Sequence, residues 1–151
     1  MAVIGPLYLF QPNTQPFMLF KIMDSPSTLF GHLLFSSFGG FVGYLGGPIL
    51  QVAFPLSLSF YLFASGKLFI TSLALFWSAQ SFFDVALYAK DARARTFILM
   101  GGPDHIWHEI LGRLGLLELD QFVSTLIYLG GVLALFAALM LGLLAARKPM
   151  R

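Results

Sequence analysis

The sequence contains no cysteine, and charged residues are scarce in it. Without cysteine there can be no disulfide, no thiolate metal ligand and no cysteine nucleophile. Charged residues make up 11% of the 151 positions, whereas a soluble domain has about 25%. The net charge of +2 is dispersed along the chain, which gives no basis for nucleic-acid binding. The rest of the composition is apolar, with 58% hydrophobic residues, 16% aromatic residues and a mean hydropathy of +0.81.

Three stretches are long and apolar enough to cross a bilayer, at 41–65, 68–88 and 122–146. A spanning helix needs about 20 mostly apolar residues, because each residue rises only ~1.5 Å through a hydrocarbon core ~30 Å thick. The only charge within 68–88 is Asp84, and the third stretch has none. The sequence therefore predicts an all-α integral membrane protein with three transmembrane helices, built as a single membrane domain over 1–151.

The segments before the first span are too short to cross a membrane. Prolines interrupt residues 1–25, which we interpret as an arm lying along the interface. Residues 26–37 are predicted to form a short helix, with Ser25 as its cap and Pro26 at its first helical position. This helix is compatible with a re-entrant element, and we place its end at the glycine-containing bend at 38–40.

Most of the charge lies in residues 89–121, between the second and third spans. This segment is predicted to be a loop that contains an amphipathic helix at 105–114. Trp107 would anchor that helix at the depth of the lipid headgroups.

Glycines are concentrated around the start of the first span. Gly43 and Gly47 form a G-x-x-x-G pair, and small residues of this kind let helix backbones approach closely in a membrane. We therefore predict a helix–helix contact lined by Gly39, Gly40, Gly43, Gly46 and Gly47. The alternative is that these glycines are merely tolerated in a helix that faces lipid.

The second span carries a polar stripe that includes Gln80 and Asp84, which we expect to be buried polar residues. A carboxylate within a span is costly unless it is protonated, paired or close to the interface. The candidate partners for Asp84 are Lys90 and Arg93 on the adjoining loop, and Gln80 one turn away.

The three histidines are the only imidazoles available for a metal or a cofactor. A zinc site could be assembled from His32, His105 and His108, with Asp91 or Glu109 as a further ligand. Alternatively, His105 and His108 are wet residues on the interfacial helix. His32 lies in an apolar segment, so its imidazole needs a partner. That partner is a backbone carbonyl or serine, a metal, or a haem- or chlorophyll-type macrocycle that His32 binds axially.

Three segments occur in order between residues 31 and 131: GHLLFSSFGGFVGYLGGPILQ, FWSAQSFFDVALYAKDARA and GGPDHIWHEILGRLGLLELD. In order and spacing they resemble a bacterial family of membrane zinc metallopeptidases of the site-two-protease type. In that family H-E-x-G-H is followed by a Phe-Gly element, a Leu-Gly-Gly helix, a D-A-R-A segment and a His-Asp-Trp helix start. The resemblance implies a protease-like helical scaffold and location in a bacterial inner, or cytoplasmic, membrane.

The departure from the family falls on the catalytic motif. Thr28 and Leu29 stand where the first histidine and the glutamate would be, and only His32 matches. Threonine is a poor zinc ligand, and leucine cannot accept the proton of an activated water. The acidic residue of His-Asp-Trp is also replaced, by Ile106. We therefore expect Thr28 and Leu29 to be packing residues, with Leu29 buried among apolar neighbours.

These observations predict a non-catalytic accessory subunit of a larger membrane complex, such as an electron-transfer or light-harvesting assembly. Its partners would be other integral membrane proteins and lipids, not nucleic acid. One alternative is a divergent intramembrane zinc metallopeptidase that uses His32 with residues of the charged loop. The other is a subunit that binds haem or chlorophyll through His32.

Overall fold

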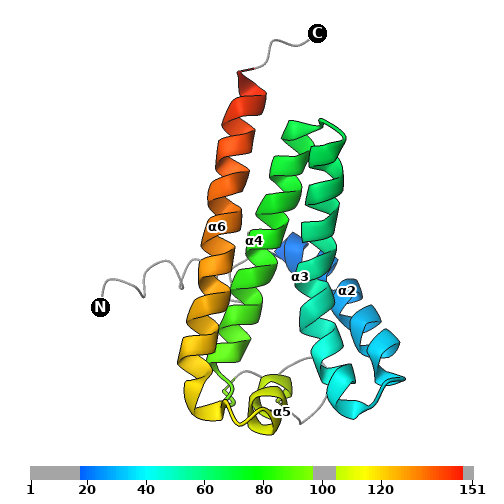
Figure 1. The fold of residues 1–151 in the computed structure, drawn as a ribbon, viewed down its shortest axis with the longest axis vertical. Coiled ribbons are helices and arrows are strands. Elements are labelled where there is room, and N and C mark those ends of the chain that lie inside the picture. The colour runs from blue at the N-terminus through cyan, green and yellow to red at the C-terminus, as the bar shows by residue number, and fades with distance from the viewer. Residues whose placement is uncertain (1–17, 97–104, 148–151) are drawn as a thin grey trace.

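The computed structural model describes residues 18–96 and 105–147, and all regular structure in these two ranges is helical. The elements are α2 (Met18–Ser36), α3 (Gly40–Ala64), α4 (Leu68–Lys90), α5 (Ile106–Arg113), the short 3-10 helix η2 (Leu117–Leu119) and α6 (Asp120–Ala146). Figure 1 shows α3, α4 and α6 as long, roughly parallel rods, with α5 across one end of the bundle. α2 begins near the middle of the bundle and runs from there toward the end that carries α5.

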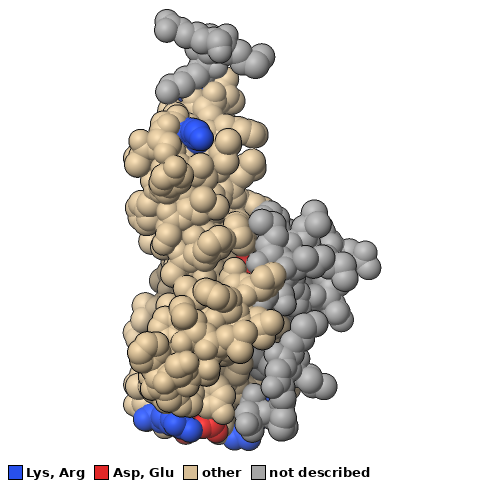
Figure 2. Space-filling view, turned by 90° about the vertical axis from the view of Figure 1, so that its right-hand side faces the viewer, with Lys and Arg blue, Asp and Glu red and all other residues tan. Residues whose placement is uncertain are grey.

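Three helical segments are long and apolar enough to cross a membrane: Gly40–Ala64, Leu68–Lys90 and Leu117–Ala146. The expectation of an all-helical chain with three such segments is therefore confirmed for the described residues. Figure 2 agrees with this, because charged side chains gather at the end that carries α5 and leave a long, mostly uncharged flank above it.

The chain reverses direction at two glycines with positive φ. Gly39, with φ of 112°, lies between α2 and α3, and Gly66, with φ of 73°, lies between α3 and α4. Residues with a Cβ rarely adopt this conformation, so glycine allows both reversals to be short. As a result α3 is antiparallel to both of its sequence neighbours.

The helix predicted at 26–37 begins earlier than the sequence suggested. α2 starts at Met18 and continues through Pro26, so the cap at Ser25 and the helix start at Pro26 are wrong. A proline inside a helix removes one backbone hydrogen bond and strains the preceding turn. The turn before Pro26 is nevertheless fixed, because Asp24 is hydrogen-bonded to α4. Of the arm predicted at 1–25, residues 18–25 are helical, and 1–17 lie outside the described residues.

α4 is the central helix of the bundle. In its most apolar stretch 56% of the residues are buried, compared with 17% for each of the other two candidate spans. Against α6, the Phe83 ring lies over Gly131, where an added Cβ would come within 2.6 Å of the ring. Phe82 lies in the same way over Gly130. We call this contact the α4–α6 seam.

α2 packs against α3 through glycine. A Cβ on Gly31 would overlap the carbonyl group of Gly46, and a Cβ on Gly46 would overlap that of Gly31. The two backbones therefore touch directly, in a contact that we call the α2–α3 seam. Gly43 also belongs to it, since a Cβ there would lie 3.2 Å from Cα of Ser36.

Gly39 and Gly40 do not belong to this contact, so the prediction that they line it is wrong. Both are exposed, and a Cβ at either would meet nothing within 4 Å. The reason is their position in the turn, beyond the point where the two helices separate.

α5 packs its apolar side onto the end of the bundle. Trp107, Ile110 and Leu111 form a buried cluster with Val85 of α4 and with neighbouring alanines. Only 9% of Trp107 is exposed. The prediction that Trp107 anchors the helix among lipid headgroups is therefore wrong, because its ring faces the protein.

Candidate functional site

The most unusual polar group in the described residues is the carboxylate of Asp24, which lies among α2, α3 and α4. Only 4% of Asp24 is exposed. Its Oδ1 accepts hydrogen bonds from Nε1 of Trp77 at 2.6 Å and from Oγ of Ser81 at 3.0 Å. Its Oδ2 accepts one from Nε2 of Gln51 at 3.3 Å. One carboxylate thus joins α2 to α3 and to α4.

Thr28 completes the group, which we call the Asp24 cluster: Asp24, Thr28, Gln51, Trp77 and Ser81. The hydroxyl of Thr28 lies 2.9 Å from the backbone oxygen of Asp24 and 3.3 Å from Oε1 of Gln51. A hydroxyl has a single hydrogen to donate, so it can serve only one of these two oxygens at a time.

The cluster lies far from either end of the bundle. Trp77 is the tenth residue of α4, so it lies roughly 14 Å along the helix from Leu68. In a bilayer crossed by α4 this position is near the middle of the hydrocarbon core. A carboxylate at that depth is costly and usually marks a functional site. Outside residues 18–23 and 25, whose side chains are not described, no described Lys, Arg or His forms an ion pair with Asp24.

His32 continues the polar face of α2 two turns beyond Asp24. Its Nδ1–H donates to the backbone oxygen of Gly43 at 2.7 Å. Its other nitrogen, Nε2, lies over Gly47, where a Cβ would overlap the imidazole. The backbone carbonyl is thus the partner of His32 in the structure. The space left by Gly47 is filled by the imidazole itself.

The positions of the peptidase motif differ in their surroundings. Thr28 faces the Asp24 cluster, but Leu29 is 62% exposed, so the expected burial of Leu29 is wrong. The reason is geometric, because successive residues of a helix point about 100° apart. With Thr28 directed toward α3 and α4, Leu29 points outward.

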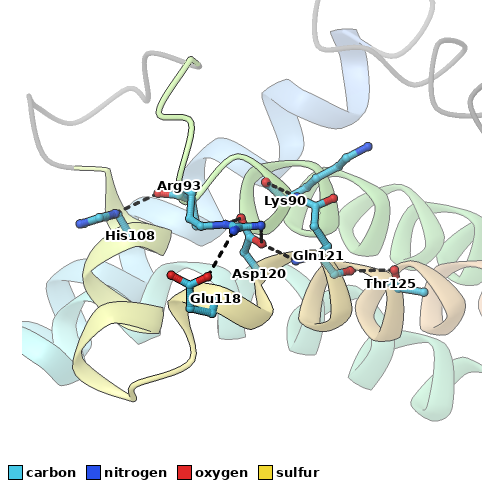
Figure 3. A network of polar contacts seen from close by, with 8 residues as sticks. Lys90, Arg93, His108, Glu118, Asp120, Gln121 and Thr125 are labelled. Atoms are coloured by element: carbon cyan, nitrogen blue, oxygen red, sulfur yellow. Dashed lines mark hydrogen bonds and ion pairs between the residues drawn. The ribbon is translucent and has the colours of Figure 1, made fainter.

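A second polar network ties the start of α6 to the end of α4 (Figure 3). Arg93 binds Asp120 in two places, with Nε 2.8 Å from Oδ2 and Nη2 2.7 Å from Oδ1. The hydrogen bond with Asp120 raises the pKa of the Arg93 guanidinium, so that it remains charged. Glu118 lies 3.5 Å from the same guanidinium, and Gln121 donates to the backbone oxygen of Lys90 at 3.1 Å.

His105 and Asp91 form a buried pair at the same end of the molecule. Nε2 of His105 lies 3.2 Å from Oδ2 of Asp91, whose Oδ1 accepts a hydrogen bond from Thr96. His105 is 7% exposed, so the interpretation of it as a wet residue is wrong. Its Nδ1 is buried and has no hydrogen-bond partner among the described residues. His108 is half-buried, and its Nδ1–H donates to the backbone oxygen of Ala92 at 3.0 Å.

The candidate metal ligands are not brought together. Among residues 18–96 and 105–147, no three His, Asp or Glu side chains are grouped so that they could hold a metal ion. His32 is bonded to α3, whereas Asp91 and His105 pair with each other near α5. Glu109 lies 3.4 Å from Arg113. A zinc site built from the three histidines is therefore not formed in the described structure.

The two buried polar residues predicted on α4 have different surroundings. Gln80 is 6% exposed, and its Nε2 has no hydrogen-bond partner, so it does not donate to Asp84. Asp84 is half-buried and interacts electrostatically with Tyr88, one turn further along. Arg93, one of the cations proposed for Asp84, is instead bound to Asp120.

Sequence reasoning missed the Asp24 cluster. In the sequence Asp24 directly precedes the helix start predicted at 25–26, and Gln51 is an isolated amide in an apolar span. The available signal was the spacing of Asp24, Thr28 and His32 at i, i+4 and i+8, which places three polar side chains on one face of an apolar helix. A further signal was that α3 contains no charged residue and a single amide, Gln51.

No family model matches the chain, and it has no significant similarity to any curated protein or solved structure.

Proposed function

We propose that this chain is a non-catalytic accessory subunit of a larger protein complex in a bacterial inner membrane, with α3, α4 and α6 crossing the bilayer. The observation that carries the proposal is the use made of the peptidase-motif positions. Thr28 is hydrogen-bonded within the Asp24 cluster, Leu29 points outward, and His32 donates to Gly43. Of the positions that would hold zinc and activate water in a peptidase, Thr28 and His32 are hydrogen-bonded to α3 here, and Leu29 faces away from the other helices.

The outer face of α2 supports the second part of the proposal, a partner in the membrane. This helix is not one of the three candidate spans, yet its outer side is strongly apolar. Its exposed side chains, between 48% and 64% accessible, are Leu29, Phe30, Leu33 and Leu34. A helix with such a face needs either lipid or a neighbouring apolar protein surface against it. We assign it to an integral membrane partner.

Site-specific photocrosslinking in native membranes tests this assignment. A photoreactive residue at Leu33, 64% exposed on α2, is expected to crosslink one integral membrane protein. The matched control is Leu133 on α6, which is 71% exposed and is expected to crosslink mainly lipid. The same partner should remain bound at a fixed stoichiometry through size-exclusion chromatography in mild detergent. A stable monomer that crosslinks only lipid from both positions would overturn the proposal.

The two cofactor-based alternatives are tested on the purified chain. A divergent zinc metallopeptidase would contain stoichiometric zinc that is lost in His32→Ala, and a haem- or chlorophyll-binding subunit would show a visible absorption band that shifts in that variant. We expect neither zinc nor pigment. The double variant Thr28→His with Leu29→Glu is expected to show no peptidase activity, because the glutamate that would have to activate a water would point outward as Leu29 does.

A further inference from the structure

We propose that Asp24 is a proton-binding site, at which the carboxyl takes up and releases a proton while Gln51 and Thr28 exchange hydrogen-bond partners. The proton comes from water and returns to water, and no other covalent bond is made or broken. The inference rests on the geometry of the Asp24 cluster, in which both protonation states can be fully hydrogen-bonded.

In the ionised state every contact of the carboxylate is supplied by a donor. Trp77 and Ser81 donate to Oδ1, and Nε2 of Gln51 donates to Oδ2. The oxygen of the Gln51 amide then accepts the hydroxyl hydrogen of Thr28, 3.3 Å away. In this arrangement the Thr28 hydroxyl donates to Gln51 and not to the backbone oxygen of Asp24.

In the protonated state the Thr28 hydroxyl donates to its other acceptor, the backbone oxygen of Asp24. A half-turn of the Gln51 amide exchanges its oxygen and nitrogen, which occupy nearly the same positions. The amide oxygen then lies about 3.3 Å from Oδ2, where it accepts the proton of the acid. The amide nitrogen donates to Thr28, whose own hydrogen turns to the backbone oxygen of Asp24 at 2.9 Å. The bonds from Trp77 and Ser81 to Oδ1 are unchanged.

The charged groups around the cluster favour a proton over a fixed ion pair. α3 carries no Asp, Glu, Lys, Arg or His, and its tyrosines lie elsewhere: Tyr44 packs toward α5 and Tyr61 is exposed. The ionisable residues of α4 are Asp84, Tyr88 and Lys90, none of which contacts the Asp24 carboxylate. On α2 itself, His32 is bonded to Gly43, and the side chain of Lys21 lies outside the described side chains.

A bound metal ion fits the cluster less well than a proton does. Metal cations such as Ca²⁺ take six to eight oxygen ligands, whereas Oδ1 of Asp24 is already occupied by two donors. The remaining oxygens, from Asp24, Gln51 and Thr28, are too few. Thr28 and Gln51 are half-buried, while Trp77 and Ser81 are buried. The proton therefore exchanges along the side formed by Thr28 and Gln51.

Trp77 provides a direct readout, because its indole N–H is bonded to the titrating group. The chain has two tryptophans, so Trp107→Phe leaves Trp77 as the only one. In lipid nanodiscs the emission of this variant is expected to change reversibly with pH in a single transition. The transition should disappear in Asp24→Asn and persist in Asp84→Asn, the control that removes the other acid of the helices around the cluster. On the unsubstituted chain, infrared spectroscopy should show a protonated-carboxyl band over the same pH range.

The reorientation of Gln51 has its own test. Gln51→Leu is expected to move the midpoint upward by about one pH unit, because the hydrogen bond lost by the ionised acid is stronger than the one lost by the neutral acid. Gln80→Leu, which removes a buried amide whose Nε2 has no partner, should leave the midpoint in place. Emission that is independent of pH, or a transition that survives Asp24→Asn, overturns the proposal. A midpoint that depends on sodium concentration also overturns it, by assigning the site to a metal cation.

Discussion

The α2–α3 seam and the α4–α6 seam use glycine in opposite ways. At the first, Gly31 and Gly46 bring two backbones into direct contact, and Thr28 and Gln51 are hydrogen-bonded between the same two helices. At the second, Gly130 and Gly131 make room for the aromatic rings of α4. A backbone cannot move aside as a ring can, so the same substitution should have different costs at the two seams. A glycine count alone does not distinguish these two kinds of contact.

The largest effect is expected where the backbones touch. Gly46→Leu should cost more than about 3 kcal/mol, beyond the usual range for overpacking, because the new side chain overlaps the Gly31 carbonyl. Thermal unfolding in detergent should show this loss, while fractionation should still find the chain in the membrane. Gly40→Ala is the control and should be neutral or slightly stabilising, since its Cβ meets nothing within 4 Å. Equal stability of the two variants would mean that the α2–α3 seam is not a close contact.

The next effect concerns the polar part of that region. Trp77→Phe keeps a ring against Phe54 but removes the N–H that donates to Asp24. We expect a loss of about 2 kcal/mol, in the range for a hydrogen bond to a charged group. In the double variant with Asp24→Asn the two losses should not add, because Asp24→Asn removes the negative charge to which the Trp77 N–H donates. If the two losses of stability added strictly, Trp77 and Asp24 would not interact.

A smaller effect is expected at the α4–α6 seam. Gly131→Ala places a methyl group 2.6 Å from the Phe83 ring, which must turn away. The expected cost is about 1 kcal/mol, at the low end for overpacking. Phe83→Leu in the same chain should recover part of this cost by making space. A loss as large as that of Gly46→Leu would show that the ring is held as rigidly as backbone.

The smallest effect is expected for a buried hydrogen bond between α4 and α6. Ser124 donates to the backbone oxygen of Ala86 at 2.8 Å. Hydrogen bonds between membrane helices contribute on average about 0.6 kcal/mol, so Ser124→Ala should lower stability by about that amount. Thr125→Ala, whose hydroxyl bonds within its own helix, is the matched control. If the stabilities of the two variants differed by well over 1 kcal/mol, hydrogen bonding would matter as much at the α4–α6 seam as at the α2–α3 seam.

The long helices could be predicted because length and hydropathy are sufficient for them. Candidate spans at 41–65, 68–88 and 122–146 correspond to α3, α4 and α6 within a few residues at each end. The start of α2 could not be predicted in the same way. Pro26 is a local signal for a helix start, and it was outweighed by the bonds of Asp24 to α4. Those bonds join residues more than 50 positions apart, which no local pattern records.

The candidate site was predictable only in part, for the same reason. Gly43, Gly46 and Gly47 lie at the α2–α3 seam, but the sequence could not exclude Gly39 and Gly40, because exposure depends on where two helices separate. Composition likewise could not show that Leu29 points outward. The orientation of Leu29 depends on which face of α2 packs against Gln51. The hydrogen bond that fixes this face joins Asp24 to Gln51, which lie 27 positions apart in the sequence.

The placement of polar side chains around α4 also bears on the order in which the helices are synthesised and packed. Translation proceeds from the N-terminus, so α2 and α3 exist before α4, and α6 is the last of the described helices to emerge. The side of α4 that bears Trp77 and Ser81 finds its partner, Asp24, already synthesised. The side that must wait for α6 presents Ala79 and Phe83, which are hydrocarbon surfaces. Lipid can cover that side in the interval, so the nascent chain need not leave a hydrogen-bonding face of α4 unpartnered at any stage of its insertion.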